Sequence, residues 1–235
     1  MNEIYVLVMS AATVGVIHTL LGPDHYLPFI VLSKARNWTR TRTMWITFIS
    51  GIGHVGGSVI LGLIGIAMGI SLSKLEAIEA NRGQIVGWML IAFGILYTVY
   101  GLIKYFRRGA HVHLPSFLRP KSIRHQDLHL GDHDLNGGSD TGRLTPWILF
   151  LIFVFGPCEV LIPMLIYPAA EHNGMGVFLV ALVFGIATIG TMLLVVMLGY
   201  QGFSFIKLKG KEYRIHLFAG LVILFAGLGM QFLGL

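Results

Sequence analysis

Two short stretches that interrupt long apolar runs decide the fold of this chain. They are Gly-Pro-Asp-His-Tyr-Leu-Pro at residues 22–28 and Gly-Pro-Cys-Glu-Val-Leu-Ile-Pro at residues 156–163. Each begins with a Gly-Pro pair, whose proline removes a backbone donor and clashes with the preceding helical turn. Each continues with two residues that can ionise or bind a metal. The Gly-Pro pairs therefore predict two helix breaks with polar groups beside them, at Gly22, Pro23, Gly156 and Pro157.

The two stretches belong to an internal repeat. They begin 134 residues apart, and Gly-Ile-Gly-His-Val-Gly at 51–56 aligns with Gly-Ile-Ala-Thr-Ile-Gly at 185–190 at the same offset. Three glycines of the first half match three of the second at an offset of 133, namely Gly87, Gly94 and Gly101 with Gly220, Gly227 and Gly234. A repeated unit with a broken helix in each copy is typical of small membrane transporters, whose site lies between the copies.

The composition is that of a membrane protein. Apolar residues make up 55% of the chain and charged residues only 12%, with a mean hydropathy of +0.75, whereas an average soluble domain is about 25% charged. Six apolar runs are long enough to cross about 30 Å of hydrocarbon; they lie at 4–32, 45–70, 84–106, 146–168, 175–200 and 214–234. We therefore expect an all-α polytopic membrane protein with six transmembrane helices, of which the first and fourth are broken.

The basic residues predict the orientation. Of the 17 Lys and Arg residues, only Lys74 and Arg82 fall outside the three connections on one side of a six-helix path. That side should face the cytoplasm, and both termini should lie on the external side of the cell (cytoplasmic) membrane. Because three helices are an odd number, the two halves must be inverted. The predicted parts are a first repeat at 1–106, a cytoplasmic loop at 107–145 and a second repeat at 146–235. The charge bias explains the net charge of +6, so no nucleic-acid partner is expected.

Ionisable side chains are rare inside the predicted spans, and each is therefore a candidate functional group. They are His18, Asp24, His25, His54, Cys158 and Glu159. Equivalent positions of an inverted repeat meet near the membrane midplane, so the pairs at the two breaks should converge. Imidazole, carboxylate and thiolate ligands together suit a divalent transition metal better than calcium or magnesium. Alternatively, His54 only bonds a neighbouring helix and Cys158 is a packing residue.

The connection between the third and fourth runs carries half of the ten histidines of the chain. They are His111, His113, His125, His129 and His133. Their spacing predicts loose metal contacts in a cytoplasmic loop. The alternative is a solvated loop in which the histidines are incidental.

Several functional classes find no support in the sequence. It holds no phosphate-binding loop, nucleotide fingerprint or Ser/His/Asp arrangement, so we expect neither an enzyme nor an ATP-driven pump, and no resident cofactor. Proton coupling through a buried carboxylate or histidine is the simplest drive for transport. The expected partners are a metal ion as substrate, the lipid bilayer and a second copy of the chain.

The same residues carry a family resemblance. The element His18-x5-Asp24-His25 resembles the His-x4-Asp-His signature of nickel/cobalt transporters, with one residue more in the spacing. The two Gly-Pro elements also resemble those of the urease-accessory (UreH-type) and TauE/SafE-like membrane proteins, which are similar to the cytochrome-c-biogenesis (CcdA/DsbD) transmembrane family. That last family passes electrons through one cysteine in each repeat. Here Cys158 stands in the second element and Asp24 in the first, so the dithiol is missing.

Together, these features predict a secondary transporter of divalent transition-metal cations, with nickel or cobalt as the first substrates. It would work by alternating access around a site between the two breaks. Three other functions stay open. They are an exporter of sulfite or a related oxyanion, a thiol-redox conduit or assembly factor that uses Cys158, and a metal-responsive maturation factor that transports nothing.

Overall fold

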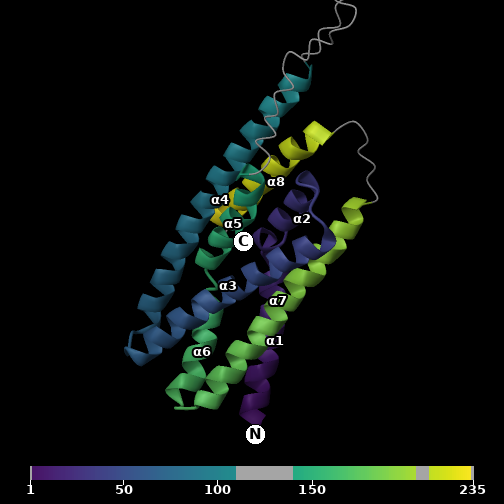
Figure 1. Cartoon of the computed structure of the whole chain (residues 1–235). Helices are drawn as coiled ribbons and strands as arrows, with labels where there is room; N and C mark the ends of the chain where they lie inside the picture. Colours follow the sequence, from purple (N-terminus) through teal and green to yellow (C-terminus); the bar gives the residue numbers. More distant parts are fainter. Residues whose placement is uncertain (1, 110–139, 205–211, 234–235) are drawn as a thin grey trace, which may run out of the picture.

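The computed structural model describes residues 2–109, 140–204 and 212–233, and the regular structure of these residues is entirely helical. The elements are α1 (Asn2–Leu21), the 3-10 turn η1 (Pro23–His25), α2 (Leu27–Ala35), α3 (Arg40–Ala67), α4 (Leu72–Gly109), α5 (Asp140–Phe155), α6 (Leu161–Ala170), α7 (Gly174–Ser204) and α8 (Glu212–Leu233) (Figure 1). The five histidines predicted to contact metal from the loop, His111, His113, His125, His129 and His133, lie outside the described residues.

Both predicted helix breaks are present. The first apolar run folds as α1 and α2 with η1 between them, and the fourth folds as α5 and α6 separated by residues 156–160. Five of the described helices (α1, α3, α4, α7 and α8) are long and apolar enough to cross a membrane, and the shorter α5 and α6 are also apolar. In series, α5 and α6 supply the sixth crossing. The prediction of an all-α polytopic membrane protein is thus confirmed.

The third helix is longer than predicted. The sequence placed its start at residue 84, but α4 begins at Leu72, so Glu79 and Arg82 belong to the helix and not to an external connection. The helix continues past these charges because the two side chains pair with each other, with Glu79 fully buried. Arg82 thus lies within α4, about three turns after its start, and not in the connection that precedes it.

Matched glycines of the repeat form the seam between α4 and α8, the most extensive contact between any two of the described helices. A Cβ atom on Gly94 would stand 2.6 Å from the backbone of Leu224, and one on Gly227 would stand 2.9 Å from the backbone of Ile91. Gly101 and Gly220 make equally close approaches to the opposite helix. Small residues of this kind let two membrane helices pack backbone to backbone.

This seam also shows the relation between the halves. Moving along α4 from Gly87 through Gly94 to Gly101, the nearest residues on α8 are Gln231, Leu224 and Leu217 in turn. The two helices are therefore antiparallel, although they are the third helices of their respective repeats. The two halves thus have opposite orientations, as the odd number of helices predicted.

The remaining helices pack reciprocally between the halves. The helix α1 packs mainly on α7, its counterpart α5 packs on α3, and α3 crosses α7. In Figure 1 the N-terminus lies at the same end of the molecule as the α3–α4 and α6–α7 turns, while the α2–α3 turn lies at the other end. This path agrees with six crossings.

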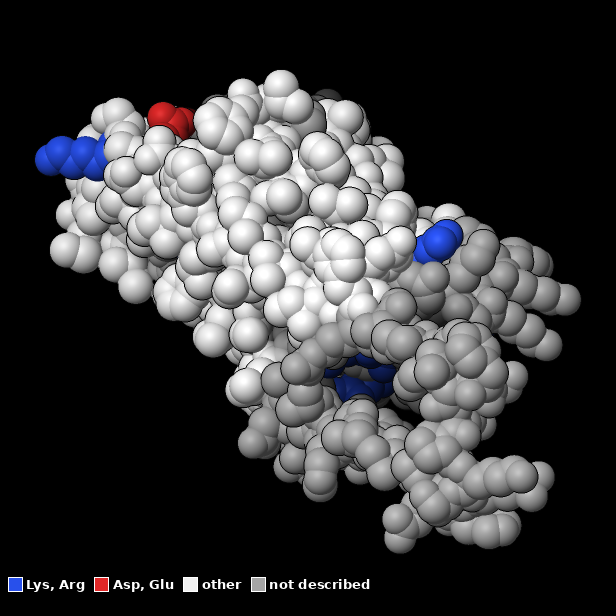
Figure 2. Space-filling model, turned by 90° about the horizontal axis from the view of Figure 1, so that it is seen from above, with Lys and Arg blue, Asp and Glu red and all other residues white. Residues whose placement is uncertain are grey.

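The outer surface is suited to lipid. Many large apolar side chains on the described helices are exposed, including Trp45, Leu96 and Phe225. On the face shown in Figure 2, the coloured charged residues lie towards the two ends, with a broad uncharged belt between them. An apolar surface of this size would be a liability in water but is the ordinary exterior of a membrane protein.

Candidate metal site at the helix breaks

Three histidines meet inside the bundle where the first helix is broken. His18 comes from the last turn of α1, His25 from η1 and His54 from the middle of α3. One ring nitrogen from each can be chosen so that all three lie within 4.8 Å of one another. The ring centroid of His25 lies 4.8 Å from that of His18 and 4.9 Å from that of His54. These positions are separated by up to 36 residues in the sequence, so the site depends on the break and on the packing of α3 against it.

The glycine of each break makes room for an imidazole. A Cβ atom on Gly22 would collide with the ring of His25, and one on Gly156 would lie 2.9 Å from Nδ1 of His54. Glycine is therefore needed at both positions for a close approach of ring and backbone. Each Gly-Pro pair thus interrupts its helix and also admits a histidine.

Backbone carbonyls set the tautomers of His25 and His54. Nδ1 of His25 lies 3.1 Å from the carbonyl oxygen of Gly22, and Nδ1 of His54 lies 3.3 Å from that of Phe153. A carbonyl oxygen only accepts hydrogen bonds, so each Nδ1 carries the proton and donates. Each Nε2 then carries a lone pair, and the two Nε2 atoms face each other across 3.3 Å.

Two facing lone pairs attract a cation. A proton or a metal ion between them would replace the repulsion of the lone pairs with two bonds. For tetrahedral coordination with metal–nitrogen bonds of about 2.0–2.1 Å, two ligand nitrogens stand about 3.3–3.4 Å apart. The observed separation of 3.3 Å fits that geometry, and neutral imidazole is a ligand that late divalent transition metals favour.

Asp24 and Cys158 lie at the edge of the histidine cluster. Oδ1 of Asp24 is 3.3 Å from Nδ1 of His25, so the carboxylate stabilises the donor side of that ring. The same oxygen is buried and makes no hydrogen bond among the described residues. Sγ of Cys158 lies 3.8 Å from Nε2 of His18, and its side chain is fully buried. Cys158 of the second break therefore lies beside the histidine cluster at the first break.

Glu159 is not part of the cluster. Its side chain is exposed, and its carboxylate lies on the side of Gly83 in α4. Neighbouring residues of a tight turn point to different sides, so Cys158 takes the inward position and Glu159 the outward one. The sequence predicted that Glu159 converges with Asp24, His25 and Cys158, whereas in the structure its side chain is exposed beside α4.

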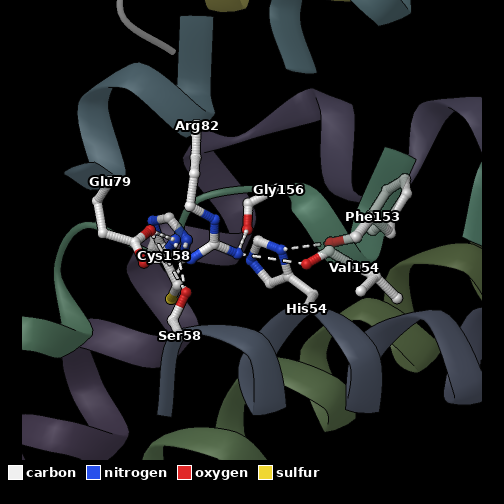
Figure 3. A network of polar contacts seen from close by, with 9 residues as sticks. His54, Ser58, Glu79, Arg82, Phe153, Val154, Gly156 and Cys158 are labelled. Carbon is white, nitrogen blue, oxygen red and sulfur yellow. Dashed lines mark hydrogen bonds and ion pairs between the residues drawn. The ribbon is translucent and has the colours of Figure 1, made fainter. Parts of the chain in front are cut away.

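A second polar network, which the sequence did not predict, closes the other break (Figure 3). Glu79 accepts from the backbone N–H of Cys158 at 3.0 Å and from the hydroxyl of Ser58 at 3.4 Å. Arg82 pairs with Glu79 and donates to the carbonyls of Val154 and Gly156, each at 3.3 Å. The one available signal was the spacing of three residues between the two charges, which favours a pair on a continuous helix.

These features define a class: a polytopic membrane protein of two inverted halves, each with a broken helix, with a cluster of histidines at the first break. Residues 27–229 match the sequence profile of the family described as cytochrome C biogenesis protein transmembrane region. Because the match spans most of the chain, the protein belongs to that family. No curated protein and no solved structure gives a significant match to this chain.

Proposed function

We propose that this protein is a secondary transporter of divalent transition-metal cations, with nickel and cobalt as the first candidates. The observation that carries the proposal is the pair of facing Nε2 atoms of His25 and His54, 3.3 Å apart, with their protons fixed on the opposite side of each ring. His18 completes a set of three imidazoles. Neutral imidazoles can bind such cations. Because they carry no negative charge, they do not hold a cation too tightly for it to be released.

The surroundings of the cluster support passage across the membrane. His54 lies near the middle of α3, and the rings of Phe153 and Phe184 stand against the histidines. An ionisable cluster in the middle of a span is costly and is usually kept for a functional reason. Rocking of the two inverted halves would open the cluster to each side in turn. Protons that displace the metal from the imidazoles would supply the coupling.

The test is ion flux into proteoliposomes that contain the purified protein. We expect flux of nickel or cobalt in the wild type. Asp24→Ala removes the carboxylate beside Nδ1 of His25, and His54→Ala removes a ligand, so each should lower the metal flux at least about 10-fold. His172→Asn is the matched control, because this exposed histidine has a positive φ that asparagine also adopts. Flux at the wild-type rate in folded Asp24→Ala and His54→Ala would overturn the proposal.

The same assay distinguishes an exporter of oxyanions. A free cationic side chain would strengthen an anion site, but Arg82, which lies against the second break, is already engaged by Glu79 and two carbonyls. Flux of sulfite without flux of metal would nevertheless favour the anion function over ours.

The second candidate is thiol redox chemistry or assembly in cytochrome c biogenesis, the process for which the family is named. It is favoured by the buried thiol of Cys158 at the second break. This sequence has a single cysteine, so a disulfide would need a thiol from a partner. Loss of function in Cys158→Ser, with metal flux absent in the wild type, would support this candidate.

A further inference from the structure

The two breaks satisfy their freed backbone groups in different ways. At the first break, the carbonyl of Gly22 is bonded by His25 of the same segment, and the carbonyl of Leu20 accepts from the hydroxyl of Tyr26. At the second break, the side-chain partners come from other helices, namely His54 of α3 and the pair Glu79 and Arg82 of α4. The shape of the second break is therefore imposed from outside.

The segment held by Glu79 and Arg82 is the one that contacts the histidines. Arg82 donates hydrogen bonds to the carbonyls of Val154 and Gly156. The neighbouring carbonyl of Phe153 accepts a hydrogen bond from Nδ1 of His54. Glu79 binds the backbone N–H of Cys158, whose sulfur contacts His18. Figure 3 shows Arg82 next to Gly156, Glu79 next to Cys158, and His54 bonded to Phe153.

This arrangement is poorly explained by stability alone. The side chain of Glu79 is 0% exposed and that of Arg82 is 19% exposed, and burying an ion pair costs desolvation free energy that its attraction often fails to recover. Apolar residues of similar volume could fill the same space, but they could not bond the backbone of residues 154–158. A buried charged pair that bonds irregular backbone next to a ligand cluster is, however, suited to orienting that cluster.

We propose that Glu79 and Arg82 are positioning residues for the histidine site. They bind no ion themselves. By holding residues 154–158, they fix the carbonyl that orients His54 and the thiol that contacts His18. This inference rests on the proposed function and adds the residues that set the affinity of the site.

The test is cobalt binding to the detergent-solubilised full chain, followed by the visible absorption of Co²⁺, which reports coordination geometry. The central variant replaces both charges together, as Glu79→Leu with Arg82→Met, because removing a buried pair as a unit leaves no unpaired charge to unfold the protein. We expect it to remain folded, to bind cobalt about 10-fold to 100-fold more weakly, and to show an altered cobalt spectrum.

Two further variants sharpen the result. Arg82→Lys keeps the ion pair but loses the planar fork that donates to several acceptors, so we expect affinity between those of the wild type and the double variant. Glu76→Gln removes an exposed carboxylate one turn earlier on α4 and should leave both affinity and spectrum unchanged.

The outcomes separate this inference from the proposed function. Wild-type affinity and spectrum in the folded double variant would overturn the positioning role alone. Absence of cobalt binding by the wild-type protein would overturn the proposed function and this inference with it.

Discussion

At the scale of single residues, the site is built from contacts between rings and backbone. Gly22 and Gly156 leave space for His25 and His54, and carbonyls at the same breaks hold the protons of these rings on Nδ1. The ligand atoms are thus oriented by the backbone that the prolines disrupt. Small changes at the glycines should therefore affect the histidines directly.

We predict that Gly156→Ala weakens cobalt binding by about 10-fold or more, as other losses of ligand support do. The new methyl group would stand 2.9 Å from Nδ1 of His54 and 3.1 Å from the carbonyl of Phe153, so the ring must turn away. Titration of the purified protein with Co²⁺ measures the effect. Gly190→Ala is the control, because a Cβ atom there meets nothing within 4 Å. Equal affinities of the two variants would contradict the prediction.

At the scale of helices, the antiparallel seam of α4 and α8 joins the two halves. The backbones approach so closely at Gly94, Gly101, Gly220 and Gly227 that even a methyl group would overlap the other helix. Dispersion and close packing are the main forces available between helices in lipid. The stability of the whole bundle should therefore be sensitive to these positions.

We expect Gly94→Val to destabilise the protein by roughly 1–3 kcal/mol, the usual cost of overpacking. Gly190→Val is the matched control, because it makes the same change of helix propensity at an exposed position. Thermal unfolding in detergent, with the two variants side by side, measures the difference. A transition temperature of Gly94→Val equal to that of the control would show that the seam tolerates separation.

At the scale of the whole molecule, the inverted halves and the basic residues together imply an orientation. The N-terminal end of α1 and the α6–α7 turn lie at one end of the bundle (Figure 1). The other end carries Lys34, Arg36, Arg40 and Arg42 around the α2–α3 turn. Basic connections stay on the cytoplasmic side, so this second end should face the cytoplasm.

We predict a matching pattern of thiol labelling in intact cells. In a Cys158→Ser background, cysteines introduced as Glu3→Cys and Glu171→Cys should react with an impermeant reagent from outside. Thr41→Cys, at the basic end, should react only after the cells are permeabilised. Labelling of Glu3→Cys and Glu171→Cys from different sides would contradict the inverted architecture.

Several of these features could be predicted from the sequence because their causes act over a few residues. A proline breaks the helix in which it stands, an apolar run crosses a membrane because of its own length, and repeated glycines show their spacing directly. The two breaks, the six crossings and the candidacy of His18, His25 and His54 follow from such local properties. The inverted relation of the halves follows from counting helices.

The residues that bond each break could not be predicted from local sequence patterns, because tertiary packing selects them. Glu79 and Arg82 stand 79 and 74 positions before the backbone groups of Cys158 and Gly156 that they bind. Their pairing let α4 extend into a region that its charges seemed to exclude. Likewise, only the turn at the second break decides that Cys158 faces inward and Glu159 outward, since both carry groups that could bind a metal. Local chemistry names the possible ligands, but the approach of α3 and α4 to the breaks selects which of them meet.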